Sequence, residues 1–220
     1  MLIKVRACAL NISDYQRFQT KKGRIPISTS LTNRLVGYIG KPLGAEISGI
    51  VVKTGKNITH VHPGDAVFGE TAGLTPAGGL AEYALMDKED VSKKPENLGF
   101  EESAANSISF DAALGVIRKA RIRPGQEVMV YGASGGAGLY AVQLAKAAGA
   151  RVTGVCSTRN IELAKEAGCD RVIDYRRQDF TQSDKKYDVI LGINGCNPMR
   201  KYKEILDDGG LFVCSGNIHQ

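Results

Sequence analysis

The pattern of apolar and polar positions changes near residue 96. Before it, short runs of strand-forming residues alternate with turns that contain glycine and proline; the runs lie at residues 2–9, 42–52, 63–69 and 78–85. Such a pattern is typical of a small, irregular β domain. After residue 96, helical and strand-like segments alternate, which is typical of a parallel sheet covered by helices. The sequence therefore predicts an α/β chain of two domains, residues 1–95 and 96–220.

The second domain contains five strand-like segments, at residues 127–131, 151–155, 171–174, 187–191 and 211–215. One helix is expected before them, at residues 100–119, and others at 139–148, 161–167 and 198–206. This repeated order of strand and helix predicts a doubly wound parallel sheet. In the first domain, residues 11–18 are expected to form a turn and a short helix.

A glycine-rich turn joins the first of these strands to its helix. Residues 132–138 read Gly-Ala-Ser-Gly-Gly-Ala-Gly, and Gly135 and Gly138 match the later glycines of the G-x-G-x-x-G pattern, with Ala133 in the first place. Glycines let the backbone approach a pyrophosphate, and the first N–H groups of the helix point at it. Such turns also occur without a ligand, but here the strand, turn, helix and second strand follow in the order of a dinucleotide-binding unit. The expected ligands are Ser134, Gly135, Gly136 and Ala137.

The residues after the second strand indicate which dinucleotide is bound. NAD sites usually carry an acid there for the ribose hydroxyls, whereas NADP sites carry basic and hydroxyl groups for the 2′-phosphate. Residues 156–160 read Cys-Ser-Thr-Arg-Asn, which includes no acid. The guanidinium of Arg159 can form charge-assisted hydrogen bonds to phosphate, although a solvated arginine at a helix start is the alternative. The segment favours NADPH, with Ser157 and Arg159 as ligands.

Composition excludes several other classes of protein. With 43% hydrophobic and 24% charged residues, the 220-residue chain has the composition of a globular protein. Its net charge is +6, but the basic residues are scattered in small groups, so nucleic-acid binding is not expected. The five cysteines form no C-x-x-C pair, which disfavours a disulfide framework or zinc knuckle. No signal peptide or long apolar span is seen, and we expect a cytoplasmic protein that does not bind membranes.

Five stretches in both halves of the chain are informative together. They are Pro-Gly-Asp-Ala-Val-Phe-Gly at 63–69, Gly-Leu-Ala-Glu-Tyr at 79–83, Arg-Pro-Gly-Gln at 123–126, the glycine turn at 132–138, and Val-Ile-Asp-Tyr at 172–175. This combination resembles the medium-chain dehydrogenase/reductase superfamily, in its zinc-independent quinone oxidoreductase branch. The resemblance implies a GroES-like domain and a Rossmann domain with NADPH in the cleft between them. It implies reduction of quinones, enones and related conjugated carbonyls, and it adds Tyr175 to the 2′-phosphate ligands.

The resemblance also bears on zinc. Zinc-dependent members carry a cysteine three residues before the position of Asp14, and a histidine in a Gly-His-Glu run. This chain has Asn11 and Ala45 at those two positions. Catalytic zinc needs about three protein ligands of N, S or O type, and neither residue is a usual one. The four-cysteine structural lobe is missing too, and His60 and His62 are interpreted as part of a polar loop, so no metal site is expected.

Without zinc, the chemistry depends on the position of the hydride and on hydrogen bonds. Hydride transfer to the β-carbon of a conjugated carbonyl places negative charge on the carbonyl oxygen, which then needs a donor. Asn11 and Tyr15 lie in the segment that lines the substrate cleft in similar enzymes, so both are expected to be catalytic. Asn11 would be an amide donor, and Tyr15 a donor or a stacking ring. Helix capping and packing remain open as an alternative for both.

Three positions depart from the pattern of similar enzymes. Gln16 stands where some relatives carry a tyrosine. Residues 110–113 read Phe-Asp-Ala-Ala where Gly-Leu-Thr-Ala is usual, so Ala112 replaces a threonine that faces the nicotinamide. Asn194 stands near the end of the fourth strand, where an aspartate is common, and is expected to contact the cofactor from there.

Similar enzymes continue at both ends, so we expect a truncated chain with an incomplete Rossmann sheet. Residues 211–215 would then form an apolar edge strand without proline or charge, which tends to recruit another strand, and a homo-oligomer is expected. Turnover is expected to be weak, because missing segments would help to exclude water. The rival interpretation is an NADP-binding protein without turnover, structural or regulatory in role.

Overall fold

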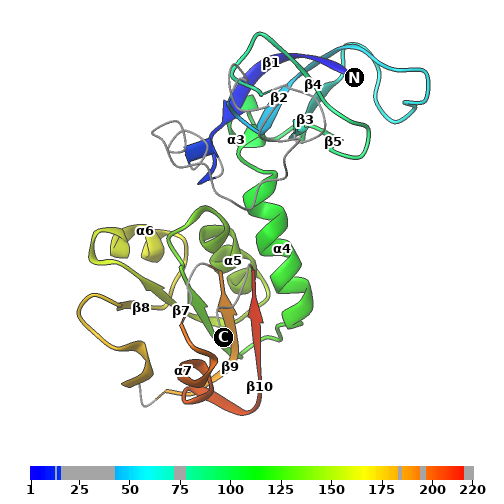
Figure 1. Ribbon diagram of the computed structural model, residues 1–220. Coiled ribbons are helices and arrows are strands. Elements are labelled where there is room, and N and C mark those ends of the chain that lie inside the picture. The colour runs from blue at the N-terminus through cyan, green and yellow to red at the C-terminus, as the bar shows by residue number, and fades with distance from the viewer. Residues whose placement is uncertain (13, 16–42, 72–77, 183–184, 194–196, 216–220) are drawn as a thin grey trace, which may run out of the picture. The chain divides into compact units, whose positions relative to one another are not determined.

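The computed structural model describes residues 1–12, 14–15, 43–71, 78–182, 185–193 and 197–215. The chain divides into two compact units, Met1–Ile108 and Ser109–Gln220. The first is built on an antiparallel sheet and the second on a parallel sheet (Figure 1). The predicted α/β class, with a GroES-like β domain and a Rossmann domain, is confirmed. The expected boundary after residue 95 stays a prediction.

The sheet of the first unit has the order β4-β1-β2-β3-β5. Its strands are β1 (Leu2–Ala9), β2 (Glu46–Lys53), β3 (Ala66–Glu70), β4 (Tyr83–Leu85) and β5 (Val91–Lys93), and every neighbouring pair is antiparallel. The buried aliphatic side chains of this unit form one core cluster, which includes Ile3, Ile47, Val51, Val61 and Val67. The first four strands lie in the segments that the pattern predicted, whereas β5 lies outside those segments.

The helix expected at residues 100–119 is interrupted in the structure. It consists of α3 (Phe100–Ala104) and α4 (Ile108–Ala120). The amide of Ile108, at the start of α4, donates a 2.7 Å hydrogen bond to Oε1 of Glu46. The first amides of a helix have no partner within it, so a buried carboxylate stabilises a helix start at this point. The apolar pattern alone did not predict the break, because its partner lies 62 residues earlier in the chain.

The sheet of the second unit has the order β10-β9-β6-β7-β8, and all its pairs are parallel. The strands are β6 (Glu127–Tyr131), β7 (Arg151–Cys156), β8 (Arg171–Asp174), β9 (Tyr187–Gly192) and β10 (Leu206–Cys214). Numbered along the chain, this is the order 5-4-1-2-3, as expected for the first five strands of a Rossmann sheet. Within the described residues, β10 pairs only with β9 and forms an edge.

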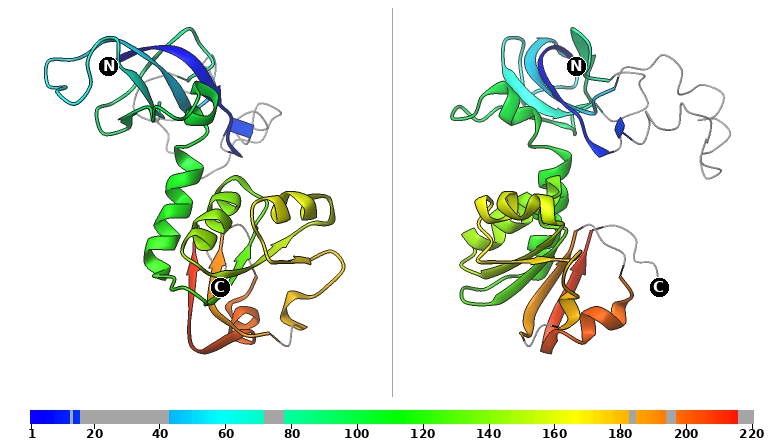
Figure 2. Two further views of the ribbon diagram at one scale, coloured as in Figure 1. Left: turned by 180° about the vertical axis from the view of Figure 1, so that it is seen from behind. Right: turned by 90° about the vertical axis from the view of Figure 1, so that its left-hand side faces the viewer.

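Helices cover both faces of this parallel sheet. On one face lie α5 (Gly136–Ala147) and α6 (Ile161–Glu166), and on the other α7 (Met199–Lys203) (Figure 2). The short turns η1 (Thr158–Asn160) and η2 (Phe180–Gln182) follow β7 and β8. None of the helices in the described part of the chain is both long and apolar enough to span a membrane.

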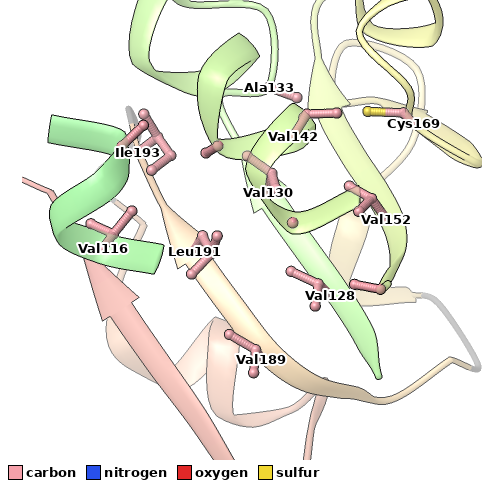
Figure 3. Close-up of a cluster of buried hydrophobic side chains, with 14 of the residues drawn as sticks. Val116, Val128, Val130, Ala133, Val142, Val152, Cys169, Val189, Leu191 and Ile193 are labelled. Atoms are coloured by element: carbon pink, nitrogen blue, oxygen red, sulfur yellow. The ribbon is translucent and has the colours of Figure 1, made fainter. Parts of the chain in front are cut away.

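Side chains alternate along the central strand β6 between two separate cores. Val128 and Val130 join the cluster that contains Val142 of α5 and Val152 of β7 (Figure 3). Met129, between them in the sequence, joins the cluster on the other face, which contains Tyr202 and Phe180. Each of these β6 side chains is fully buried. Because both faces are covered, the sheet holds the carboxyl ends of its strands, where ligands bind in such folds, in fixed positions.

Candidate functional site

The glycine turn between β6 and α5 is anchored to the end of β7. The amides of Gly132 and Ala133 both donate to the carbonyl of Val155, at 3.0 and 3.1 Å. Gly132 has φ +87°, in the left-handed region that favours glycine. The turn therefore has one defined path, which brings the start of α5 to the carboxyl end of the sheet.

The two glycines of the motif have different reasons to be glycine. A Cβ on Gly138 would lie 2.0 Å from the carbonyl oxygen of Gly132, so close packing of the helix on the turn requires a glycine there. A Cβ on Gly135 would come no nearer than 3.5 Å to the same oxygen, which is ordinary contact. Packing within the chain therefore explains Gly138 but not Gly135, and an open backbone at Gly135 suits the close approach of a ligand.

The first turn of α5 fits the phosphate groups of a dinucleotide. Gly135 is the N-cap residue of this 12-residue helix, and it provides no side-chain cap. The N–H groups of the first turn have no partner inside the helix, and the helix dipole favours negative charge at that end. Ser134, Gly135 and Ala137 are half-buried and Gly136 is exposed, so the predicted ligands lie together along one turn. Their contact with a cofactor stays a prediction.

Two of the three predicted 2′-phosphate ligands, Ser157 and Tyr175, directly follow the neighbouring strands β7 and β8. Cys156 of β7 pairs with Asp174 of β8 in the sheet register, and the amide of Tyr175 donates to the carbonyl of Cys156 at 3.1 Å. Ser157 and Tyr175 are the next residues on the two strands, so the structure brings their backbones side by side.

Arg159 lies close by in η1. Its side chain is exposed, and no carboxylate of the described residues forms an ion pair with it. Tyr175 is 47% exposed, whereas Ser157 is buried. A guanidinium that is exposed and has no ion pair within the described part of the chain, together with an exposed phenol at the ends of parallel strands, forms an arrangement that can accept a phosphate.

The sequence pattern missed an acid beside these ligands. Asp174 ends β8 and is only 5% exposed. The hydroxyl of Thr158 donates to its Oδ2 at 2.6 Å, and the amide of Arg176 donates to its Oδ1 at 3.0 Å. The Thr158 hydroxyl is the main cause that holds the pKa of Asp174 below its usual value. The acid lies at the end of β8, which is paired with the end of β7, whereas the residues that follow β7 include none.

A second missed residue contacts the glycine turn. Nδ2 of Asn160, at the end of η1, donates to the hydroxyl oxygen of Ser134 at 3.0 Å. This bond connects two of the predicted ligand segments, and the residues lie 26 positions apart in the chain.

Asn11, one of the two predicted catalytic residues of the first unit, lies in a partly buried hydrogen-bond network. Nδ2 of Asn11 donates to Oε2 of Glu46 at 2.9 Å, and Oδ1 of Asn11 accepts from the amide of Ile12 at 2.7 Å. Asp14 accepts from the amides of Asn11 and Gly44, at 2.9 and 2.8 Å. Asn11 thus has a structural role here, and its catalytic role stays a prediction. Tyr15 is 58% exposed, and its catalytic role stays a prediction too.

The remaining predictions concern metal ligands and three altered positions. The side chain of Ala45 has no ligand atom, and the described residues contain no group of three or more His, Cys, Asp or Glu side chains arranged to hold a metal ion. Phe110 contacts Tyr140 edge-on, with ring centroids 5.5 Å apart, and Ala112 is half-buried. Gln16 and Asn194 lie outside the described residues.

A half-buried thiol in the first unit, Cys8, and a buried thiol in the second, Cys169, give a testable property of both units. Burial and the carboxylates of Asp14 and Glu46 raise the pKa of Cys8 from 9.0 to about 11, and burial is also the main cause that raises the pKa of Cys169 to about 11. Since the thiolate is the nucleophile, a shift of this size lowers the reactive fraction at pH 8 by about 100-fold. We expect both thiols to be alkylated by iodoacetamide far more slowly in the folded protein than in urea.

Peptide mapping by mass spectrometry measures this rate for each cysteine. Unfolded thiols ionise from about pH 9.0, before the folded ones. The contribution of these two raised pKa values to the free energy of unfolding is therefore complete below pH 9.0, and it is lost as the pH rises towards 11. Equal rates in the folded and unfolded protein at pH 8 would contradict the expectation.

Two family models match the chain. The alcohol dehydrogenase GroES-like domain matches residues 1–96, and the domain described as zinc-binding dehydrogenase matches residues 136–220. The chain is 31% identical over 225 residues to 2-methylene-furan-3-one reductase of Solanum lycopersicum, and 32% identical over 230 residues to quinone oxidoreductase of Homo sapiens. These alignments cover 99% of this chain but 55% and 64% of the respective relatives.

The fold comparison agrees with the sequence comparison. The structure of the quinone oxidoreductase from Coxiella burnetii superimposes with a TM-score of 0.78 at 28% identity, and the match covers 97% of this chain and 66% of that one. The chain belongs to the medium-chain dehydrogenase/reductase superfamily and is similar to its quinone oxidoreductases. It spans little more than half to two thirds of the length of these relatives.

Proposed function

We propose that the protein binds NADPH and transfers a hydride from it to a quinone or a conjugated carbonyl. The observation that carries the cofactor proposal is the group of Ser157, Arg159 and Tyr175 at the ends of β7 and β8, with the guanidinium exposed and free of an ion pair among the described residues. The substrate class is supported by similarity to quinone oxidoreductases and to an NADPH-dependent alkenal/one oxidoreductase of Arabidopsis thaliana, 28% identical over 221 residues.

A few residues of each unit have a role in this proposal. The amides of the first turn of α5 bind the pyrophosphate, and Arg159 with its neighbours binds the 2′-phosphate. When bound, NADPH supplies the hydride for the β-carbon of the substrate. An amide or hydroxyl donor, Asn11 or Tyr15, stabilises the negative charge that develops on the carbonyl oxygen. Since Nδ2 of Asn11 already donates to Glu46 at 2.9 Å, that carboxylate would hold the amide in one orientation.

The test is steady-state oxidation of NADPH by the full chain, with a panel of quinones and enones. Turnover that is faster with NADPH than with NADH supports the proposal. The alternative is a cofactor-binding protein without turnover, and tight binding of NADPH without oxidation by any compound of the panel would favour it. We also propose a cytoplasmic location. We further propose a homo-oligomer joined through the edge of β10, and light scattering that compares the unmutated protein with Val213→Lys would test this oligomer.

We propose in addition that catalysis needs no zinc. Asn11 and Ala45 stand where zinc-dependent relatives have a cysteine and a histidine, and Nδ2 of Asn11 is hydrogen-bonded to Glu46. Because catalytic zinc requires about three protein ligands, we expect chelators to leave activity unchanged and elemental analysis to find no stoichiometric metal. One tightly held zinc ion per chain would contradict this proposal.

A further inference from the structure

The short turn η1 is fixed by one hydrogen bond on each side of Arg159. Before the arginine, the hydroxyl of Thr158 donates to Oδ2 of Asp174 at 2.6 Å. After it, Nδ2 of Asn160 donates to the hydroxyl oxygen of Ser134 at 3.0 Å. The side chains of Thr158 and Asn160 are thus anchored by hydrogen bonds. The side chain of Arg159 between them is exposed and has no ion pair among the described residues.

The anchor before Arg159 is itself rigidly held. Besides Thr158, the carboxylate of Asp174 accepts from the amide of Arg176, and its carbonyl accepts from the amides of Arg177 and Gln178 at 3.0 and 2.9 Å. Nε of Arg177 lies 3.6 Å from Oδ2 of the same carboxylate. The bond from Thr158 therefore connects η1 to the turn that contains Tyr175, the other exposed ligand proposed for the 2′-phosphate.

The anchor after Arg159 leads to the other end of the site. Ser134 belongs to the glycine turn that precedes α5. A hydroxyl can accept one hydrogen bond and still donate its own hydrogen. By occupying an acceptor position of Ser134, Asn160 leaves this hydrogen available to a phosphate oxygen and limits its direction.

We infer that Thr158 and Asn160 are two positioning residues with separate effects on the cofactor. Thr158 holds the backbone of Arg159 beside the Tyr175 turn, and so it determines the preference for a 2′-phosphate. Asn160 holds the Ser134 hydroxyl, and so it contributes to the affinity for any dinucleotide. Groups that are ordered before binding lose less entropy when the ligand arrives, which gives both hydrogen bonds their effect on affinity. The inference rests on the proposed binding of NADPH.

The first experiment removes the Thr158 hydroxyl and keeps the shape of the side chain. Calorimetry with the full chain compares 2′,5′-ADP, which carries the 2′-phosphate, with 5′-AMP, which does not. We expect Thr158→Val to weaken binding of 2′,5′-ADP about tenfold, the scale of one lost hydrogen bond, and to leave binding of 5′-AMP unchanged. The matched control is Thr158→Ser, which restores the hydroxyl and should restore the preference for 2′,5′-ADP.

The second experiment tests Asn160 through its partner. Asn160→Ala should weaken NADPH and NADH by the same factor, about threefold to tenfold, so that their ratio stays constant. In a Ser134→Ala background the same change should have no further effect, because Asn160 acts through that hydroxyl. Unfolding curves for each variant show whether it is folded under the conditions of the binding measurement.

Three results would overturn the inference. They are an equal loss of both nucleotides in Thr158→Val, a Thr158→Ser variant that behaves like the valine variant, and a loss of NADPH alone in Asn160→Ala. An unmutated protein that does not distinguish 2′,5′-ADP from 5′-AMP would overturn it as well. The proposed function fails separately: if the binding results are as expected but no quinone or enone is reduced, the positioning roles stand and the proposed reaction does not.

Discussion

Replacing Gly138 with alanine is expected to lower the free energy of unfolding of the parallel-sheet unit by roughly 3 kcal/mol, near the upper end of the usual cost of overpacking. The added Cβ would lie 2.0 Å from the carbonyl oxygen of Gly132, and 2.9 Å from its carbonyl carbon. Both are backbone atoms, which cannot move aside as the end of a side chain can. The turn would have to shift away from α5, and it is also held by two hydrogen bonds to Val155.

Urea unfolding followed by circular dichroism measures this loss. Gly115→Ala is the matched control, because Gly115 is an exposed residue of α4 and no atom of the described residues lies within 4 Å of an added Cβ. In a helix this change usually stabilises by about 0.5–1 kcal/mol. If Gly138→Ala unfolded at the same urea concentration as the unmutated protein, the packing explanation for this glycine would be wrong.

Gly135→Ala separates folding from binding at the same turn. The nearest atom to its added Cβ is 3.5 Å away, and φ is −78°, which any residue can adopt. We expect unchanged stability together with weaker binding of both NADPH and NADH, because the methyl group would stand where the pyrophosphate approaches. Unchanged binding would show that the cofactor does not lie against this glycine.

Replacing Arg159 with alanine is expected to weaken NADPH binding by about tenfold to a hundredfold, the range for a lost charge-assisted hydrogen bond. NADH, which has no 2′-phosphate, should bind as before. The guanidinium is exposed and forms no ion pair among the described residues, so its loss should not affect the fold. The preference of NADPH over NADH should therefore fall without a change in the unfolding curve.

Arg171→Ala is the matched control for this substitution. Arg171 is exposed and begins β8, whereas Tyr175, one of the proposed phosphate ligands, follows the carboxyl end of the same strand. The change in net charge is identical, so any long-range effect of charge on an anionic cofactor appears in both variants. Calorimetry at one salt concentration compares them. Equal losses in the two variants would mean that Arg159 acts only through net charge.

Much of the fold could be predicted from local patterns. The alternation of Val128, Met129 and Val130 between two cores is what a strand covered on both faces requires, and the glycine turn marked the start of α5. These features depend on residues close together in the sequence, where periodicity and turn chemistry are informative. The order of the parallel strands also followed, because such folds allow few connections.

The features that the sequence did not predict depend on distant partners. The break before α4 follows from Glu46, and the links of η1 follow from Asp174 and Ser134. Nothing in the neighbourhood of Thr158 or Asn160 in the sequence indicates that their side chains are anchored to other strands. For the same reason, the hydrogen bond from the amide of Asn11 to a carboxylate 35 residues away could not be predicted, and the catalytic role of Asn11 stays a prediction.

The order of strands in the parallel sheet also bears on how the chain reaches this structure. The central strand β6 pairs with β7 through Val128 and Val152, and with β9 through Val128 and Val189. The first pairing closes a much shorter loop than the second, and shorter loops close at a lower entropic cost. During synthesis β6, α5 and β7 can therefore assemble while β9 is still in the ribosome. The glycine turn, fixed by the end of β7, would then take its final form before half of the sheet exists.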